Sequence, residues 1–161
     1  MIGAAMKKID WKNLSYDDFT GFVAVTAFLL FVLYFGGLWY ATYDYRIQMR
    51  DQMVGMYQHL PEPLPVVSED YGVHQRWLVF YIDGIKILNK PQPENVINEY
   101  RKALEKEGWA AEREYVRNDK NKTYGINMRK GEFVFSVSAR ENRDSINIHL
   151  IKRDWIYHMG L

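Results

Sequence analysis

The sequence predicts an α+β protein in which one N-terminal transmembrane helix precedes a small two-layer domain. That domain is expected to be an antiparallel sheet of about four to six strands with one covering helix. Three observations predict this fold class: an uncharged apolar run at residues 19–43, a proline-rich segment at 61–65, and strand patterns around one amphipathic helix beyond it. With 161 residues, the chain has room for one such domain and excludes a multidomain enzyme.

The apolar run extends over 25 consecutive residues, 19–43, after a short tail at 1–18. An α-helix rises about 1.5 Å per residue and a hydrocarbon core is about 30 Å thick, so roughly 20 apolar residues cross it. The alternative is a helix buried in a soluble core. Apolar side chains occur all round this run, which favours a transmembrane helix.

The end of the run argues against a cleaved signal peptide. Such a peptide has an apolar region of about 7 to 15 residues and a small-x-small cleavage site. This run is longer and ends in aromatic residues, which are typical of the headgroup level of a membrane. The predicted interfacial anchors are Trp39, Tyr40, Tyr43 and Tyr45.

No ionisable residue interrupts the run, although proton relays and ion pathways usually need one. The helix is therefore predicted to be an anchor rather than part of a lone channel. Small residues spaced four apart allow close approach of a second helix. They form a candidate helix-packing face made of Thr20, Ala24, Gly37 and Ala41.

Positive charges near the two ends of the run indicate the orientation. Lys7, Lys8 and Lys12 precede the run, whereas Arg46 and Arg50 follow it. This excess predicts a cytoplasmic N-terminus and an extracytoplasmic C-terminal domain on a cell membrane. The chain has no cysteine, which is compatible with either compartment.

A helical extension is expected over 44–60, where methionines are interleaved with charged residues. Pro61, Pro63 and Pro65 lack amide donors and have fixed φ angles, so the helix must stop there. We expect a Pro-rich linker at 61–70 and a domain boundary between it and the α+β domain at 71–161.

The domain opens with a strand at 77–82, a tight hairpin or bulge at Asp83-Gly84, and a continuation at 85–88. The segment Pro91-Gln-Pro93-Glu94 opens a helix, and Gly108 is its expected end. Four further strands are predicted to form an antiparallel meander, and the helix covers its apolar face. These strands lie at 109–116, 123–128, 132–140 and 146–150, and the apolar helix face contains Val96, Ile97, Tyr100, Ala103 and Leu104.

Neither a metal site nor a catalytic site is predicted. The four histidines form no zinc-binding pair, and no serine occupies a sharp strand-to-helix turn of the kind that activates a nucleophile. His149 alternates with apolar residues, so it is predicted to be an exposed surface histidine. We therefore expect no cofactor, no metal and no enzymatic activity.

Basic residues are concentrated in the third and fourth of the domain's predicted strands and their turn. This candidate interaction patch contains Arg113, Arg117, Lys120, Lys122, Arg129 and Lys130. Such a patch is suited to anionic lipid headgroups or an acidic partner, and to nucleic acid only in the cytoplasm, which the predicted orientation disfavours. The alternative is that these lysines protect an edge strand from aggregation.

These observations predict a single-pass membrane protein that presents a small α+β domain to other membrane or envelope proteins, as an accessory or assembly subunit. One alternative is a membrane-tethered sensory module that binds a ligand or lipid. Another is an enzyme with an unfamiliar site. An apolar cavity with a few polar groups would favour the sensory module, whereas a flat apolar or basic patch on an exposed sheet edge would favour the subunit.

Overall fold

The structure is a computed structural model that describes residues 16–118 and 121–158. The chain divides into two compact units, Met1–Asp44 and Tyr45–Leu161. In the first unit, α1 (Tyr16–Ala41) contains a 23-residue segment, Phe19–Ala41, that is long and apolar enough to cross a membrane. None of the side chains in that segment is buried, as expected of a helix whose apolar surface faces lipid.

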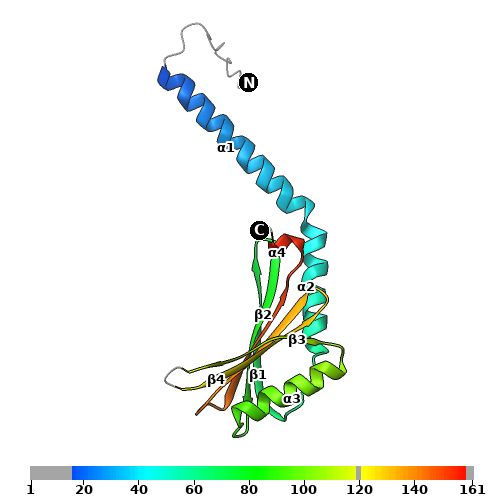
Figure 1. Ribbon diagram of the computed structural model, residues 1–161. Helices are drawn as coiled ribbons and strands as arrows, with labels where there is room; N and C mark the ends of the chain where they lie inside the picture. Colours follow the sequence, from blue (N-terminus) through cyan, green and yellow to red (C-terminus); the bar gives the residue numbers. More distant parts are fainter. Residues whose placement is uncertain (1–15, 119–120, 159–161) are drawn as a thin grey trace. The chain divides into compact units, whose positions relative to one another are not determined.

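The second unit contains a six-stranded antiparallel sheet with the strand order β1-β2-β6-β5-β4-β3. Figure 1 shows this sheet, with β1 to β4 labelled. β1 and β2 form a hairpin, α3 leads to the far edge, and the meander returns until β6 pairs with β2. The predicted fold class and the four-stranded meander are therefore confirmed. The strands are β1 (Val66–Arg76), β2 (Val79–Leu88), β3 (Ala110–Arg117), β4 (Thr123–Lys130), β5 (Phe133–Arg140) and β6 (Ser145–Lys152).

The predicted amphipathic helix is α3 (Pro93–Lys106). Pro93 occupies its first turn, where the missing amide donor costs nothing, and Glu94 lies at the positive end of the helix dipole. Gly108 follows the helix with a φ of 82°, a left-handed conformation typical of helix ends. The buried face consists of Val96, Ile97, Tyr100 and Leu104.

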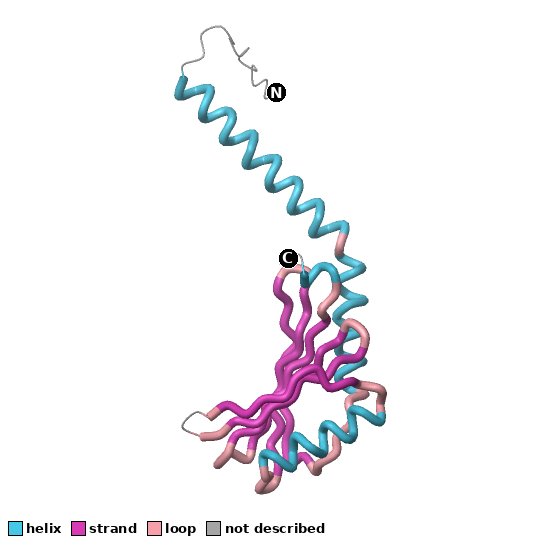
Figure 2. Tube along the Cα trace, in the orientation of Figure 1, coloured by secondary structure: helices cyan, strands magenta, loops and turns pink. Residues whose placement is uncertain are grey.

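A second helix also covers the sheet, where the sequence predicted only one. This helix, α2 (Tyr43–Gln58), runs beside the sheet (Figure 2). It contributes Met49, Met53 and Tyr57, which are buried in the same core as α3. Their spacing of four places them on one side of the helix. The predicted extension at 44–60 is thus part of the folded unit, which begins at Tyr45 rather than at residue 71.

One predicted linker and one predicted turn are wrong. β1 begins at Val66, so the second half of the predicted 61–70 linker is an edge strand, mostly exposed and therefore without apolar alternation. Asp83-Gly84 lies inside the continuous strand β2, and the chain reverses instead at Trp77, whose φ is 55°. Gly84 is needed because a Cβ there would lie 2.7 Å from the Tyr57 hydroxyl.

The sheet has two different faces. The covered face, which packs against α2 and α3, is apolar and contains residues such as Ile82, Ile126, Phe135 and Leu150. The outer face carries the alternate residues of each strand, including Tyr81, Asp83, Ser138, Arg140 and His149. Because successive side chains of a strand point to opposite faces, the same alternation that builds the core fixes the composition of the outer face.

Candidate functional site

The outer face is the main surface that the second unit offers for recognition, because neither α2 nor α3 lies on it. It combines exposed apolar residues with polar and aromatic ones. Ile85 and Ile87 of β2 are 50% and 43% exposed although they belong to an interior strand. Beside them, an open hollow of about 540 Å³ is lined by outer-face residues such as Asp70, Gly72 and Asn147.

Aromatic rings and histidines form a row across β1, β2 and β6 on this face. The His74 ring stacks on Tyr81 with 5.1 Å between ring centres, and Tyr81 lies 5.6 Å from the His149 ring. His149 Nδ1 is within hydrogen-bond distance of Asp83 Oδ1, at 2.6 Å. We call His74, Tyr81, Asp83 and His149 the His–Tyr row. His149 is partly exposed on the outer face, as its alternation predicted.

Sequence reasoning did not find the His–Tyr row, because its members come from three strands. Strand alternation places Tyr81 and Asp83 on one face, but only the register pairs His74 with Tyr81 and Asp83 with His149. The pairing of β2 with β6 joins strands that are far apart in the sequence. No local signal in the chain indicates it.

Asp83, His149 and Ser136 are consecutive cross-strand neighbours, in the order of a catalytic triad. In the described part of the chain, however, no hydrogen bond joins Ser136 to His149. Ser136 also lies within β5, an interior strand whose backbone is paired with β4 and β6. Acyl transfer needs free N–H donors for the developing oxyanion, and a strand paired on both sides has few to offer.

A polar cluster on the covered face joins α2, the proline-rich segment, β1 and β2. Lys86 is 5% exposed and forms ion pairs with Glu62 and, at 3.2 Å, with Glu69. The Tyr57 hydroxyl donates to Glu69 Oε1 at 2.6 Å. The pKa of Tyr57 is raised, mainly by burial and secondly by this hydrogen bond. Burial and the nearby carboxylates Glu62 and Glu69 also raise the pKa of Tyr100, whose buried hydroxyl has no hydrogen-bond partner among the described residues. The cluster fastens α2 and the proline-rich segment to the sheet.

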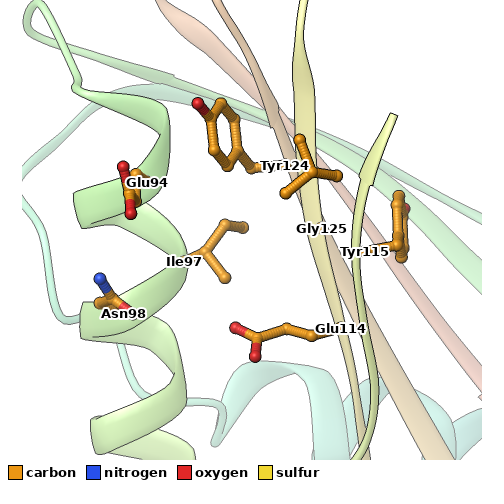
Figure 3. A pocket seen from close by; sticks show the side chains of 8 residues that line it. Glu94, Ile97, Asn98, Glu114, Tyr115, Tyr124 and Gly125 are labelled. Carbon is orange, nitrogen blue, oxygen red and sulfur yellow. The ribbon is translucent and has the colours of Figure 1, made fainter. Parts of the chain in front are cut away.

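A cavity of about 290 Å³ opens between α3 and the edge formed by β3 and β4 (Figure 3). Ile97 of α3 and Tyr124 of β4 supply apolar walls, and Glu94 and Glu114 supply carboxylates. Glu114 forms an ion pair with Arg101. The cavity therefore offers a small, partly apolar space with acidic groups at its margin.

The residues of the predicted basic patch lie in different local environments. Arg129 pairs with Glu112 at 3.5 Å, and Lys130 Nζ donates to the Glu107 carbonyl at the end of α3, at 2.6 Å. Their charges are therefore engaged by neighbouring groups, and Lys130 helps to close the loop between α3 and β3.

Arg113 and Arg117 occupy outer-face positions of β3, and Lys122 is exposed just before β4. Lys120 lies outside the described residues. Arg117 meets two arginines that the sequence did not single out, Arg140 and Arg143, around a hollow on the outer face.

The residues predicted to act in the membrane lie on or just after α1. All four members of the candidate helix-packing face, Thr20, Ala24, Gly37 and Ala41, are exposed. Of the predicted anchors, Trp39, Tyr40 and Tyr43 are also exposed. Tyr45 belongs instead to the folded unit, where its hydroxyl donates to Asp154 Oδ2 at 3.1 Å.

In comparisons with protein-family models, with curated proteins and with solved structures, the chain has no match.

Proposed function

We propose that this chain is a single-pass membrane protein whose outer sheet face binds another protein, as an accessory or assembly subunit of a membrane or envelope complex. The observation that carries the proposal is the composition of the outer face. The half of this face formed by β1, β2 and β6 holds the stacked His–Tyr row next to Ile85 and Ile87, which are exposed on an interior strand.

Protein interfaces are enriched in aromatic residues and arginine and depleted of lysine and aspartate at their centre. Rigid aromatic side chains also lose little conformational entropy on binding, so they make efficient anchors. In the outer face, Tyr81 is held between two histidine rings and is therefore ordered before a partner arrives. A face of this kind favours a protein partner over a small molecule.

Site-specific photo-cross-linking in the native membrane tests this proposal. A photoreactive residue at position 85, on the outer face, should form a discrete adduct with a partner protein. One at position 102, on the exposed side of α3, should not. The adduct should be lost in a Tyr81→Ala, His74→Ala variant. The same adducts from both positions, or an adduct that the variant keeps, would contradict the proposal.

The proposed membrane topology places the N-terminus in the cytoplasm and the folded unit outside it, with α1 as the anchor. The absence of cysteine from the chain permits a direct test. A Lys106→Cys variant, on exposed α3, should react with a membrane-impermeant maleimide in intact cells. Labelling only after the membrane is opened would reverse the orientation.

A second candidate function is ligand binding in the cavity between α3 and β4. Ile97 and Tyr124 line it together with the polar side chains of Glu94 and Asn98, the mixture that small-molecule sites usually show. Replacing Ile97 with Trp would fill this space. If the chain carries a ligand through purification, native mass spectrometry should detect it in the parent protein and not in Ile97→Trp.

A further inference from the structure

We propose that the outer face contains a separate site for a phosphate monoester, at the end of the sheet where β3 meets β4 and β5 meets β6. A hollow of about 260 Å³ lies there, apart from the His–Tyr row. Its donors are three guanidinium groups and three hydroxyl groups, from Arg117, Arg140, Arg143, Thr123, Ser138 and Ser145. This inference does not depend on the proposed protein interaction.

The strand register brings these groups together. Arg117 of β3 is opposite Thr123 of β4, and Thr123 is opposite Arg140 of β5. Ser138 is opposite Asn147 of β6, whose amide adds a further donor to the hollow. All of these side chains except that of Arg143, which lies in the turn between β5 and β6, therefore project from four neighbouring strands of one sheet, a more rigid support than a loop.

Backbone hydrogen bonds connect described residues at this end. The Glu141 N–H donates to the Lys122 carbonyl at 2.9 Å and links the residue before β4 to the turn after β5. Asn142 has a φ of 62°, a conformation that Asn tolerates. The Arg143 N–H donates to the Arg140 carbonyl at 3.3 Å. Arg143 is thereby turned back toward the hollow.

Among the described residues, no carboxylate compensates the charge of the site. None of the described carboxylates lines the hollow, and the nearby Glu141 and Asp144 are not among its lining residues. In the described part of the chain, none of Arg117, Arg140 and Arg143 takes part in an ion pair. Arg140 Nε donates to the Thr123 hydroxyl at 3.3 Å. Three positive charges thus face one small space, where an anion would be stabilised.

The donor set identifies the class of anion. One arginine satisfies a planar carboxylate in a bidentate pair, so three arginines with hydroxyl and amide donors exceed what a carboxylate accepts. A phosphate monoester carries up to two negative charges and three terminal oxygens. The volume of the hollow exceeds that of the phosphate group alone, and the Tyr115 ring beside Arg117 offers an apolar wall for the attached organic part.

Binding to the full chain in uncharged detergent micelles tests the site. Inorganic phosphate and then soluble phosphate monoesters are titrated at constant ionic strength, with broadening of their phosphorus resonances as the readout. The unmodified chain should bind them saturably. Binding should weaken about tenfold or more in Arg140→Gln and in Arg143→Gln, since each removes charge-assisted hydrogen bonds.

Arg76→Gln is the matched control, because Arg76 is an exposed arginine at the end of β1 outside the hollow. It should bind phosphate as the unmodified chain does, and Arg143→Lys should retain part of the affinity. A parallel titration with short-chain phosphatidic acid distinguishes the sources of the group: tighter, Arg140-dependent binding of this lipid would assign a headgroup as the ligand. Absence of saturable binding, or equal losses in Arg76→Gln and Arg140→Gln, would overturn the site.

Discussion

Three tyrosine hydroxyls lie inside the folded unit, and burial is the largest cause of the raised pKa in each of them. Tyr45 is half-buried, and burial together with the Asp154 carboxylate raises its pKa to about 12. Tyr57 and Tyr100 are more deeply placed, and their pKa values are also raised. Each hydroxyl must keep its proton for the native packing, so the folded unit resists tyrosine ionisation.

This resistance predicts a loss of stability at alkaline pH. A raised native pKa stabilises the fold fully below the unfolded pKa of 10.0, and that contribution disappears as the pH rises toward the native value. For Tyr45 the window lies between pH 10 and about 12. Urea unfolding across this window should show a shallower loss of stability for Tyr45→Phe than for the unmodified chain. Equal slopes would indicate that Tyr45 ionises freely in the native state.

The ion pairs of Lys86 allow a prediction for the removal of one buried charge. In Lys86→Met, Glu69 keeps its hydrogen bond from the Tyr57 hydroxyl but loses its ion pair with Lys86. We therefore expect the free energy of unfolding to fall by about 1–3 kcal/mol. The half-exposed Glu62 moderates the effect. The control is Lys102→Met, which removes an exposed pair with Glu99 and should cost about 0.5 kcal/mol or less. Equal effects in urea unfolding would contradict the assignment of Lys86 as a buried link.

At the scale of single elements, α2 shows why sequence reasoning succeeded in one part of the chain and not in another. α3 has a strong apolar stripe and clear end signals, so both its limits and its buried face were predicted. In α2 the buried apolar residues are two methionines and a tyrosine, Arg46 is buried as well, and the neighbours are charged. Its covering role therefore depends on a groove that only the sheet creates. The outer-face sites likewise depend on pairings between distant strands.

The contact of α2 with β2 predicts the outcome of a small substitution. Gly84→Ala should lower stability by about 1–3 kcal/mol, because the added methyl group would meet the Tyr57 hydroxyl and the Tyr71 Cβ. Tyr57→Phe removes that hydroxyl, so the cost of Gly84→Ala should be smaller in the Tyr57→Phe background. A double-mutant cycle measures this difference. If the two changes are additive, the close approach of Tyr57 does not explain the glycine.

At the scale of the whole molecule, the two units predict different behaviour for two fragments. The full chain should stay in the membrane through alkaline carbonate extraction, whereas residues 43–161 should be soluble and unfold cooperatively. Residues 66–161 lack Met53 and Tyr57, which expose almost no surface in the core, and should not unfold cooperatively. Circular dichroism during urea unfolding checks both fragments. Cooperative unfolding of 66–161 would show that α2 is dispensable.

The pairing of β2 with β6 sets the order in which this chain can mature. Tyr81 is opposite Ile151, so one side of β2 finds its partner only when nearly the whole polypeptide has been synthesised. A nascent chain that already carries its apolar anchor would meanwhile display β1 and β2 as a hairpin with an open edge, which other chains can pair with. Sheets whose paired strands lie close together in the sequence do not pass through such a stage. A stop codon shortly before Ser145 would consequently leave a product prone to aggregate, although five of the six strands would be present.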